Sequence, residues 1–198
     1  EFSGLDAFLV MEKEGINYSF ELIRNIRNTF TTELLNPQEV LNVKEINIHY
    51  EKKSQSEIFN FNLSGGVAFP DSSFQFELLD GKLKIKGGAD TFFDTTLIWA
   101  TPIKVSLPKE GKIITKPFFL KPDLIPFNRE IQMDIFLDPL YISDHLGIYS
   151  YNPKKSDWTY LSSELYSDSL FIRTSISSGD IFAVIEEINP PELSEFTP

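Results

Sequence analysis

The 198-residue chain contains no cysteine, only two histidines and only five alanines. Without cysteine, the sequence excludes disulfide scaffolds, thiolate catalysis, cysteine-ligated zinc and iron–sulfur clusters. His49 and His145 stand far apart in the chain, so they do not indicate a multi-histidine metal site. We therefore expect no catalytic residue, no metal and no cofactor. The scarcity of alanine beside 21 isoleucines, 21 leucines and 18 phenylalanines favours strands over helices.

Basic residues are also in short supply. The chain has 18 lysines and arginines against 29 acidic residues, and its net charge of −11 argues against a nucleic-acid partner. No apolar run approaches the roughly 18 residues that a membrane-spanning helix needs, so we expect no membrane span. The chain starts without methionine or a signal-peptide pattern, and we expect it to be an excised or processed segment of a longer protein.

Apolar and polar residues alternate along most of the chain. In residues 16–22 every even position is apolar and every odd position is polar, which predicts a half-buried strand. Similar patterns predict strands near residues 46–50, 59–63, 74–78, 83–85, 97–99, 131–137, 146–151, 158–161, 170–176 and 181–185. The turn-rich residues 152–157 and 177–180 predict that the last four strands form two hairpins.

The predicted architecture is all-β. One helical turn is expected over residues 37–43, with Asn36 as its N-cap and Pro37 in its first position. The length admits one large domain or two small ones, and the best local break lies at residues 65–73. We predict two antiparallel, immunoglobulin-like β-sandwich modules in tandem, at residues 1–72 and 73–188. The proline-rich residues 189–198 are predicted to be a linker or tail.

Residues 80–191 show a characteristic order of segments. A strand at 80–85 leads to a turn of small residues and aspartate, a strand at 89–98, an extended Leu-x-Pro segment at 119–122 and a strand at 131–135. This order resembles β-sandwiches of the ankyrin and netrin-receptor type. The following segments, 146–151, 158–161, 179–184 and 190–191, are similar to the C-terminal sandwich modules of long bacterial envelope proteins, some of which carry an upstream lysostaphin-type zinc peptidase domain.

The resemblance implies a non-catalytic part of such a protein. Lysostaphin-type peptidases need a His-x-His pair with a further His and Asp, and this chain has only two isolated histidines. Some relatives of the ankyrin-type sandwich cleave themselves at a His-Phe-Ser step. Here His49 precedes Tyr50 and His145 precedes Leu146, so self-cleavage is not expected. The resemblance also implies a secreted or cell-envelope location in a bacterium.

Positive charge is concentrated in one stretch. Residues 82–121 contain eight lysines and three acidic residues, a net charge of +5 that leaves −16 for the rest of the chain. A basic face that includes Lys82, Lys84 and Lys86 is one candidate site for an anionic envelope polymer. The alternative is that these lysines lie at sheet edges and prevent aggregation between sheets.

Aromatic residues give a second candidate site. Tyr151, Trp158 and Tyr160, with Trp99 and Tyr149, would form a platform for stacking sugars if their rings were exposed. We expect Tyr151 and Tyr160 to be exposed, because they flank the polar loop at residues 153–156. The same residues are equally consistent with a buried core. We predict a non-enzymatic segment of a larger exported protein that acts as a spacer, adhesion or substrate-positioning module beside the other domains of that protein. The alternative is a module that binds carbohydrate or an envelope polymer through these aromatic rings or the lysine-rich face.

Overall fold

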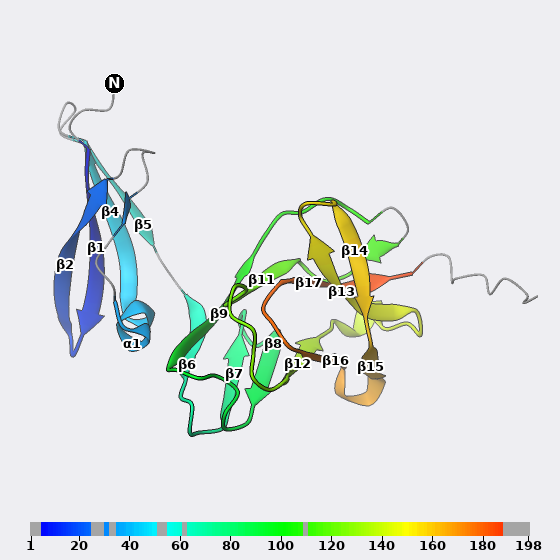
Figure 1. The fold of residues 1–198 in the computed structure, drawn as a ribbon. Helices are drawn as coiled ribbons and strands as arrows, with labels where there is room; N and C mark the ends of the chain where they lie inside the picture. The colour runs from blue at the N-terminus through cyan, green and yellow to red at the C-terminus, as the bar shows by residue number, and fades with distance from the viewer. Residues whose placement is uncertain are drawn as a thin grey trace, which may run out of the picture. The chain divides into compact units, whose positions relative to one another are not determined.

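A computed structural model describes residues 5–24, 30–31, 35–50, 55–60, 63–108 and 111–187. The chain divides into two compact units, Glu1–Leu63 and Ser64–Pro198. Among these described residues all strand pairs are antiparallel and helix is nearly absent, which confirms the predicted all-β class (Figure 1). The predicted linker or tail at residues 189–198 lies outside the described residues.

The first unit contains a single five-stranded sheet within its described residues. Its strands are β1 (Leu5–Lys13), β2 (Ile16–Arg24), β3 (Phe30–Thr31), β4 (Val43–Tyr50) and β5 (Gln55–Asn60), in the order β3-β2-β1-β4-β5. The central strand β1 places Leu9 and Met11 in a small core with Val43, and its Ala7 is also buried. No second sheet is present among these residues, in contrast to the sandwich expected for residues 1–72.

Strand β2 follows the predicted alternation but is not as buried as expected. Phe20 and Tyr18 lie opposite Leu9 and Met11 of β1 in the register, and Ile16 shares their face of β2. Ile16, Tyr18 and Phe20 are 57%, 44% and 37% exposed, whereas Leu9 and Met11 are buried. The apolar face of this sheet is therefore covered over β1 and open over most of β2.

The helix α1 (Pro37–Leu41) has the predicted N-terminus. Asn36 Oδ1 accepts a hydrogen bond from the Glu39 backbone N–H at 3.0 Å, and Glu39 Oε2 accepts one from the Asn36 N–H at 3.0 Å. Pro37 stands at the start of the helix, where no intrahelical N–H bond is lost. This reciprocal capping explains why a single turn of helix forms in a chain that otherwise favours strands.

The second unit contains two antiparallel sheets. The β17 sheet consists of β14 (Asp157–Leu161), β13 (Leu146–Asn152), β17 (Ile181–Glu186), β11 (Phe118–Lys121), β9 (Thr96–Pro102) and β6 (Ser64–Ala68) in that order, with β10 (Lys112–Ile113) also paired to β17. The β12 sheet has the order β15 (Ser163–Tyr166), β16 (Phe171–Ile176), β12 (Ile131–Phe136), β8 (Leu83–Gly87) and β7 (Phe74–Leu78). Two short 3-10 helices, η2 (Pro139–Tyr141) and η3 (Ser167–Ser169), lie in the connections.

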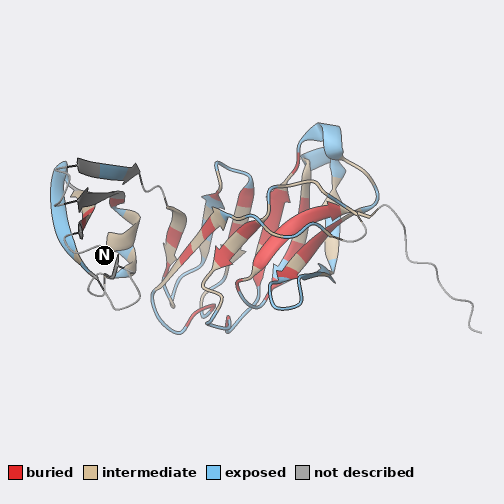
Figure 2. Cartoon of the chain, turned by 90° about the horizontal axis from the view of Figure 1, so that it is seen from above, coloured by how far each residue is buried: buried red, intermediate tan, exposed pale blue. Residues whose placement is uncertain are grey.

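The two sheets contribute to one hydrophobic core. Ile98, Leu120 and Val184 of the β17 sheet belong to the same buried cluster as Ile85 and Met133 of the β12 sheet. These side chains come from alternate positions of their strands, so each strand presents one face to the core. Figure 2 shows the buried residues gathered along the strands of this unit.

The division between the units lies nine residues before the expected boundary at 72/73. Strand β6 pairs with β9 over residues 64–68 and therefore belongs to a sheet of the second unit. The predicted hairpin of residues 146–161 is confirmed, because β13 pairs with β14 around the turn at 153–156. The predicted hairpin of residues 170–185 is wrong. Strand β16 pairs with β12 and β17 pairs with β13, so residues 177–180 cross from one sheet to the other.

Strand β17 is buried on both of its faces. Phe182 and Val184 point into the core, while Ile181 and Ile185 are equally buried on the opposite face. The extended residues 103–106, which follow β9, line one surface pocket together with Ile181 on this outer side. A connection between strands thus adds a partial third layer to the outer side of the β17 sheet.

Candidate functional site

The predicted aromatic site lies on the outer side of the β17 sheet. Tyr151 of β13 faces Trp158 of β14 in the register, and Tyr149 faces Tyr160. We predicted that Tyr151 and Tyr160 would be exposed. Tyr160 is 54% exposed, but Tyr151 is only 6% exposed because Trp158 and residues 103–106 pack against it.

The rings of this cluster do not form a flat surface. The planes of Tyr151 and Trp158 meet at 52° with their centroids 5.0 Å apart, and Tyr149 and Tyr160 meet edge to face at 65°. The Trp158 indole N–H donates to the Ser106 carbonyl at 3.1 Å. These contacts hold the cross-strand pairs together and fix the connection above them, which is the structural use of such residues.

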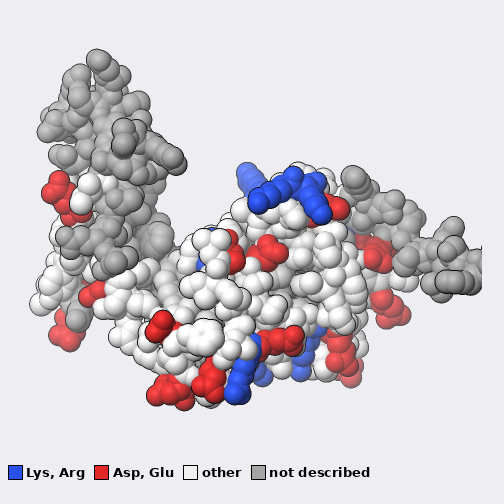
Figure 3. All heavy atoms as spheres, in the orientation of Figure 1, with Lys and Arg blue, Asp and Glu red and all other residues white. Residues whose placement is uncertain are grey.

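Two of the three predicted lysines lie on the outer face of the β12 sheet. Lys84 and Lys86 alternate with the buried Leu83 and Ile85 of β8. Lys84 has its amine 3.9 Å from the carboxylate of Glu77. Charged side chains seen in Figure 3 form small separate groups, so the visible face has no continuous basic stripe.

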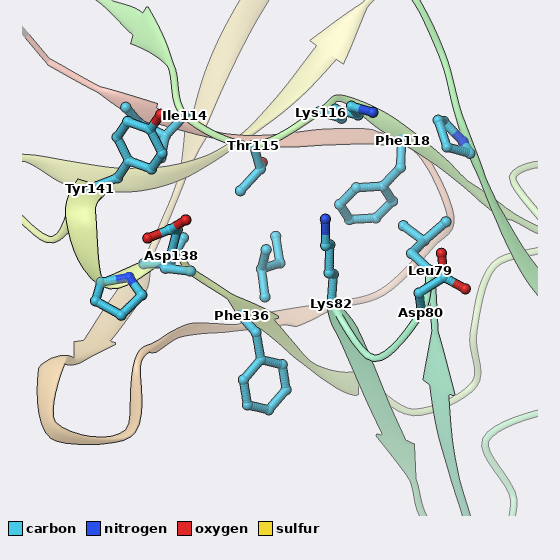
Figure 4. Close-up of a pocket in the computed structure, with 14 residues that line it drawn as sticks. Leu79, Asp80, Lys82, Ile114, Thr115, Lys116, Phe118, Phe136, Asp138 and Tyr141 are labelled. Atoms are coloured by element: carbon cyan, nitrogen blue, oxygen red, sulfur yellow. The ribbon is translucent and has the colours of Figure 1, made fainter.

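Lys82 occupies a different place, at the mouth of a pocket in the second unit. The pocket has a volume of about 600 Å³ and opens at the end of the core, where the β7–β8 turn, the end of β12 and residues 114–117 meet. Figure 4 shows the Lys82 amine directed across the pocket toward Thr115 and Phe118, with the Asp138 carboxylate turned toward the same space.

The floor and walls of the pocket are apolar. The buried side chains of Phe118, Ile135 and Leu137 form the floor and belong to the main core. Leu79 and Ile114 form walls and are half-buried against the same core. The pocket is therefore an opening into the core at one end of the two sheets.

The β7–β8 turn that forms one wall has an unusual backbone. Leu79, Asp80 and Gly81 all have positive φ, at 53°, 56° and 78°. This conformation suits glycine, but it is costly for leucine, which lacks the short polar side chain that stabilises such turns. Leu79 is held there by its packing on the core and by its backbone N–H, which donates to Ser64 Oγ at 2.6 Å.

Polar groups surround the mouth. Lys82, Lys116, Asp80 and Asp138 line it, and Thr115 lies between them. Asp138 Oδ1 accepts the backbone N–H of Leu140 at 3.0 Å and so caps η2. Positively and negatively charged groups thus meet beside an apolar interior, an arrangement suited to a ligand with one apolar and one polar end.

Two other lysines of the lysine-rich stretch, Lys121 and Lys112, contact groups of the protein itself. Lys121 Nζ donates to Asp123 Oδ1 at 2.6 Å, and this hydrogen bond lowers the pKa of Asp123. The Lys121 amine also lies 4.0 Å from the centroid of the Phe119 ring. The Lys112 amine lies 5.5 Å from the centroid of the Tyr141 ring, which lines the pocket.

His145 does not line this pocket. His145 is exposed in the turn before β13, and its backbone carbonyl accepts the Glu187 N–H at 3.0 Å. The side chain of His49 in β4 lies outside the described residues. Within the described ranges, no three His, Asp or Glu side chains are grouped closely enough to hold a metal ion.

Sequence reasoning identified Lys82 and missed the rest of the pocket. The excess of lysine in residues 82–121 indicated Lys82 and contained Lys116. No sequence motif marks Thr115, Leu79 or Ile114 as a site residue, because only the packing of the two sheets brings them together. The closeness of the β7–β8 turn to residues 114–117 has no counterpart in the order of the sequence.

In the described parts of the chain, no helix has both the length and the apolar character to cross a bilayer. The sequence matches no protein-family model and no curated protein.

Proposed function

We propose that this chain is a non-catalytic segment of a larger exported or cell-envelope protein and that its second unit is an immunoglobulin-like β-sandwich that binds an apolar ligand. The single observation that carries the binding function is the pocket of about 600 Å³ floored by Phe118, Ile135 and Leu137. Its volume falls within the range of roughly 300–1,000 Å³ that is usual for small-molecule sites.

The position of the pocket supports a binding role. It lies at an end of the two sheets, where turns and connections meet, and such ends carry the binding loops of many β-sandwiches. Its floor consists of buried core side chains, so it is supported by the rigid part of the fold. Binding there requires no rearrangement of a strand.

The tandem arrangement supports a role within a larger protein. Two compact β units follow one another directly, with β5 ending at Asn60 and β6 starting at Ser64. Chains of β modules are typical of exported proteins that act as spacers or adhesins, and the resemblance of residues 80–191 to envelope modules points in the same direction. In this proposal the partners are the other domains of the parent protein and the ligand of the pocket.

A methyl-resolved NMR titration of the whole chain with decanol tests the binding function. We expect saturable shifts at the methyl groups of Leu79, Ile114 and Ile135, which line the pocket. The buried methyl groups of Ile98 and Ile176, which belong to the core but do not line the pocket, serve as internal controls and stay unchanged. No shift up to the solubility limit of decanol, or equal shifts in both sets, would refute the proposal.

A further inference from the structure

The mouth of the pocket carries more positive than negative groups. Lys82 and Lys116 line it, and the amine of Lys112 stands over its wall residue Tyr141. Against these three amines stand the carboxylates of Asp80 and Asp138. Asp138 is already engaged as the cap of η2, so its negative charge is partly satisfied within the protein.

The two lining lysines have no ion-pair partner in the described parts of the chain. No carboxylate of a described residue lies within 4.0 Å of the amine of Lys82 or of Lys116. Lys82 nevertheless extends toward the interior of the pocket (Figure 4). An amine placed at the edge of an apolar space without a counter-ion attracts an anionic group, since charge-assisted hydrogen bonds are the stronger kind.

Thr115 adds a second donor. Its Oγ1 accepts the backbone N–H of Val184 at 3.0 Å, which fixes the position of the hydroxyl oxygen. Among the described residues, none accepts the hydroxyl proton of Thr115. The proton is thus free to be donated to a ligand in the pocket, on the side toward which Lys82 extends.

We propose that the ligand is a fatty carboxylate. Its alkyl chain lies along Leu79, Ile114 and Phe118, and its carboxylate is held by the amines of Lys82 and Lys116 and by the Thr115 hydroxyl. The inference rests on the proposed function, because it assigns a headgroup to the ligand of the same pocket. It commits to an anion because, among the described residues, both lysine amines that line the pocket and the Thr115 hydroxyl are donors without a partner.

Isothermal titration of the whole chain with three ligands of equal chain length tests this assignment. Decanoate, decanol and decyltrimethylammonium are compared below their micelle-forming concentrations. We expect decanoate to bind about tenfold more tightly than decanol or better, as one charge-assisted contact implies, and the cation to bind most weakly. Because the extra affinity is electrostatic, it decreases as salt is raised from low to physiological concentration.

Lysine variants give the matched controls. Lys82→Gln and Lys116→Gln each reduce decanoate affinity several-fold and leave decanol affinity unchanged. Lys86→Gln removes the same charge from the outer face of the β12 sheet and leaves both affinities unchanged.

Equal binding of decanoate and decanol overturns the carboxylate assignment and leaves the proposed function standing. Failure of all three ligands to bind overturns both, and an equal effect of Lys86→Gln shows that net charge alone attracts the anion, which also overturns the assignment.

Discussion

Arg173 of β16 donates two hydrogen bonds to the carboxylate of Asp134, its register partner in β12. The distances are 2.7 Å from Nε to Oδ1 and 2.9 Å from Nη2 to Oδ2. Asp134 is 3% exposed, and the guanidinium lies 4.9 Å from the ring centroids of both Tyr166 and Phe171. The hydrogen bonds to Asp134 raise the pKa of Arg173 above its ordinary value. The pair is a fixed element of the outer face of the β12 sheet.

Asp134→Asn tests how much this pair contributes to the free energy of unfolding. An asparagine offers one acceptor where the carboxylate offers two, and it leaves the Arg173 charge without a counter-ion, so we expect a loss of about 2–3 kcal/mol in the free energy of unfolding. Urea denaturation measures this loss. The matched control is Asp90→Asn, whose ion pair with Arg129 is more than half exposed at both ends and is expected to contribute less than about 1 kcal/mol. Losses of equal size in the two variants would contradict the prediction.

Gly179 is required by a close backbone approach. A Cβ at this position would lie far inside van der Waals contact with the backbone carbonyl oxygens of Leu120 and Pro122, which cannot turn away as a side chain can. We expect Gly179→Ala to lower the free energy of unfolding by about 3 kcal/mol, at the upper end of typical overpacking costs. In the control Gly88→Ala, the new methyl group meets nothing within 4 Å, and no such loss is expected. Thermal unfolding of both variants decides whether the carbonyl contact is the cause.

Because the pKa of Tyr149 is raised, we predict a loss of stability at alkaline pH. Burial, and then the hydrogen bond to Glu187, raise the pKa of Tyr149 above its ordinary value near 10. Above that ordinary value the unfolded chain loses the phenolic proton while the folded chain keeps it, so the free energy of unfolding falls as pH rises. The stabilisation from Tyr149 is thus complete below about pH 9 and is lost progressively above about pH 10. Denaturant unfolding from pH 8 to 11 should show a shallower decline in Tyr149→Phe, and identical slopes would disprove this cause.

The aromatic cluster predicts a negative result with sugars. Trp158 is tied to Ser106 and packed at an angle against the buried Tyr151, so the rings offer no flat platform. We expect peptidoglycan fragments and soluble β-glucans to cause no change in tryptophan fluorescence and no heat in calorimetry. A saturable fluorescence change that disappears in Trp158→Phe would instead establish a sugar site on this hairpin.

The strands of the second unit could be predicted because most of them bury only one face. Alternation is visible in β7, β8 and β12, where every second side chain enters the core.

Strand β1 of the first unit shows no such alternation in the sequence. Its Phe8 and Val10 are apolar, like the buried Ala7, Leu9 and Met11 on the other face. A central strand with apolar residues on both faces reads as a continuous run and gives no period.

Pairing between distant strands could not be read from the sequence. The turn residues 177–180 are as polar as those of a hairpin, yet they lead from β16 in one sheet to β17 in the other. The reason is burial. Because β17 is apolar on both of its faces, it is stable only as an inner strand of a sheet with both faces covered. The same limit applies to the pocket. Lys82 was expected on one strand face with Lys84 and Lys86, but the left-handed turn at residues 79–81 redirects it to the pocket mouth.

Because β17 is a central strand, the β17 sheet of the second unit cannot be completed until the end of the chain is available. Residues 181–186 pair with β13 on one side and with β10 and β11 on the other, so they join the two halves of their sheet. During synthesis on the ribosome, these halves have no common neighbour until the last strand has emerged. Because the joining contacts link residues far apart in sequence, closure of the sheet is slow compared with hairpin formation. A chain stopped before residue 181 therefore exposes the unpaired edges of β11 and β13, which are open to pairing with other chains.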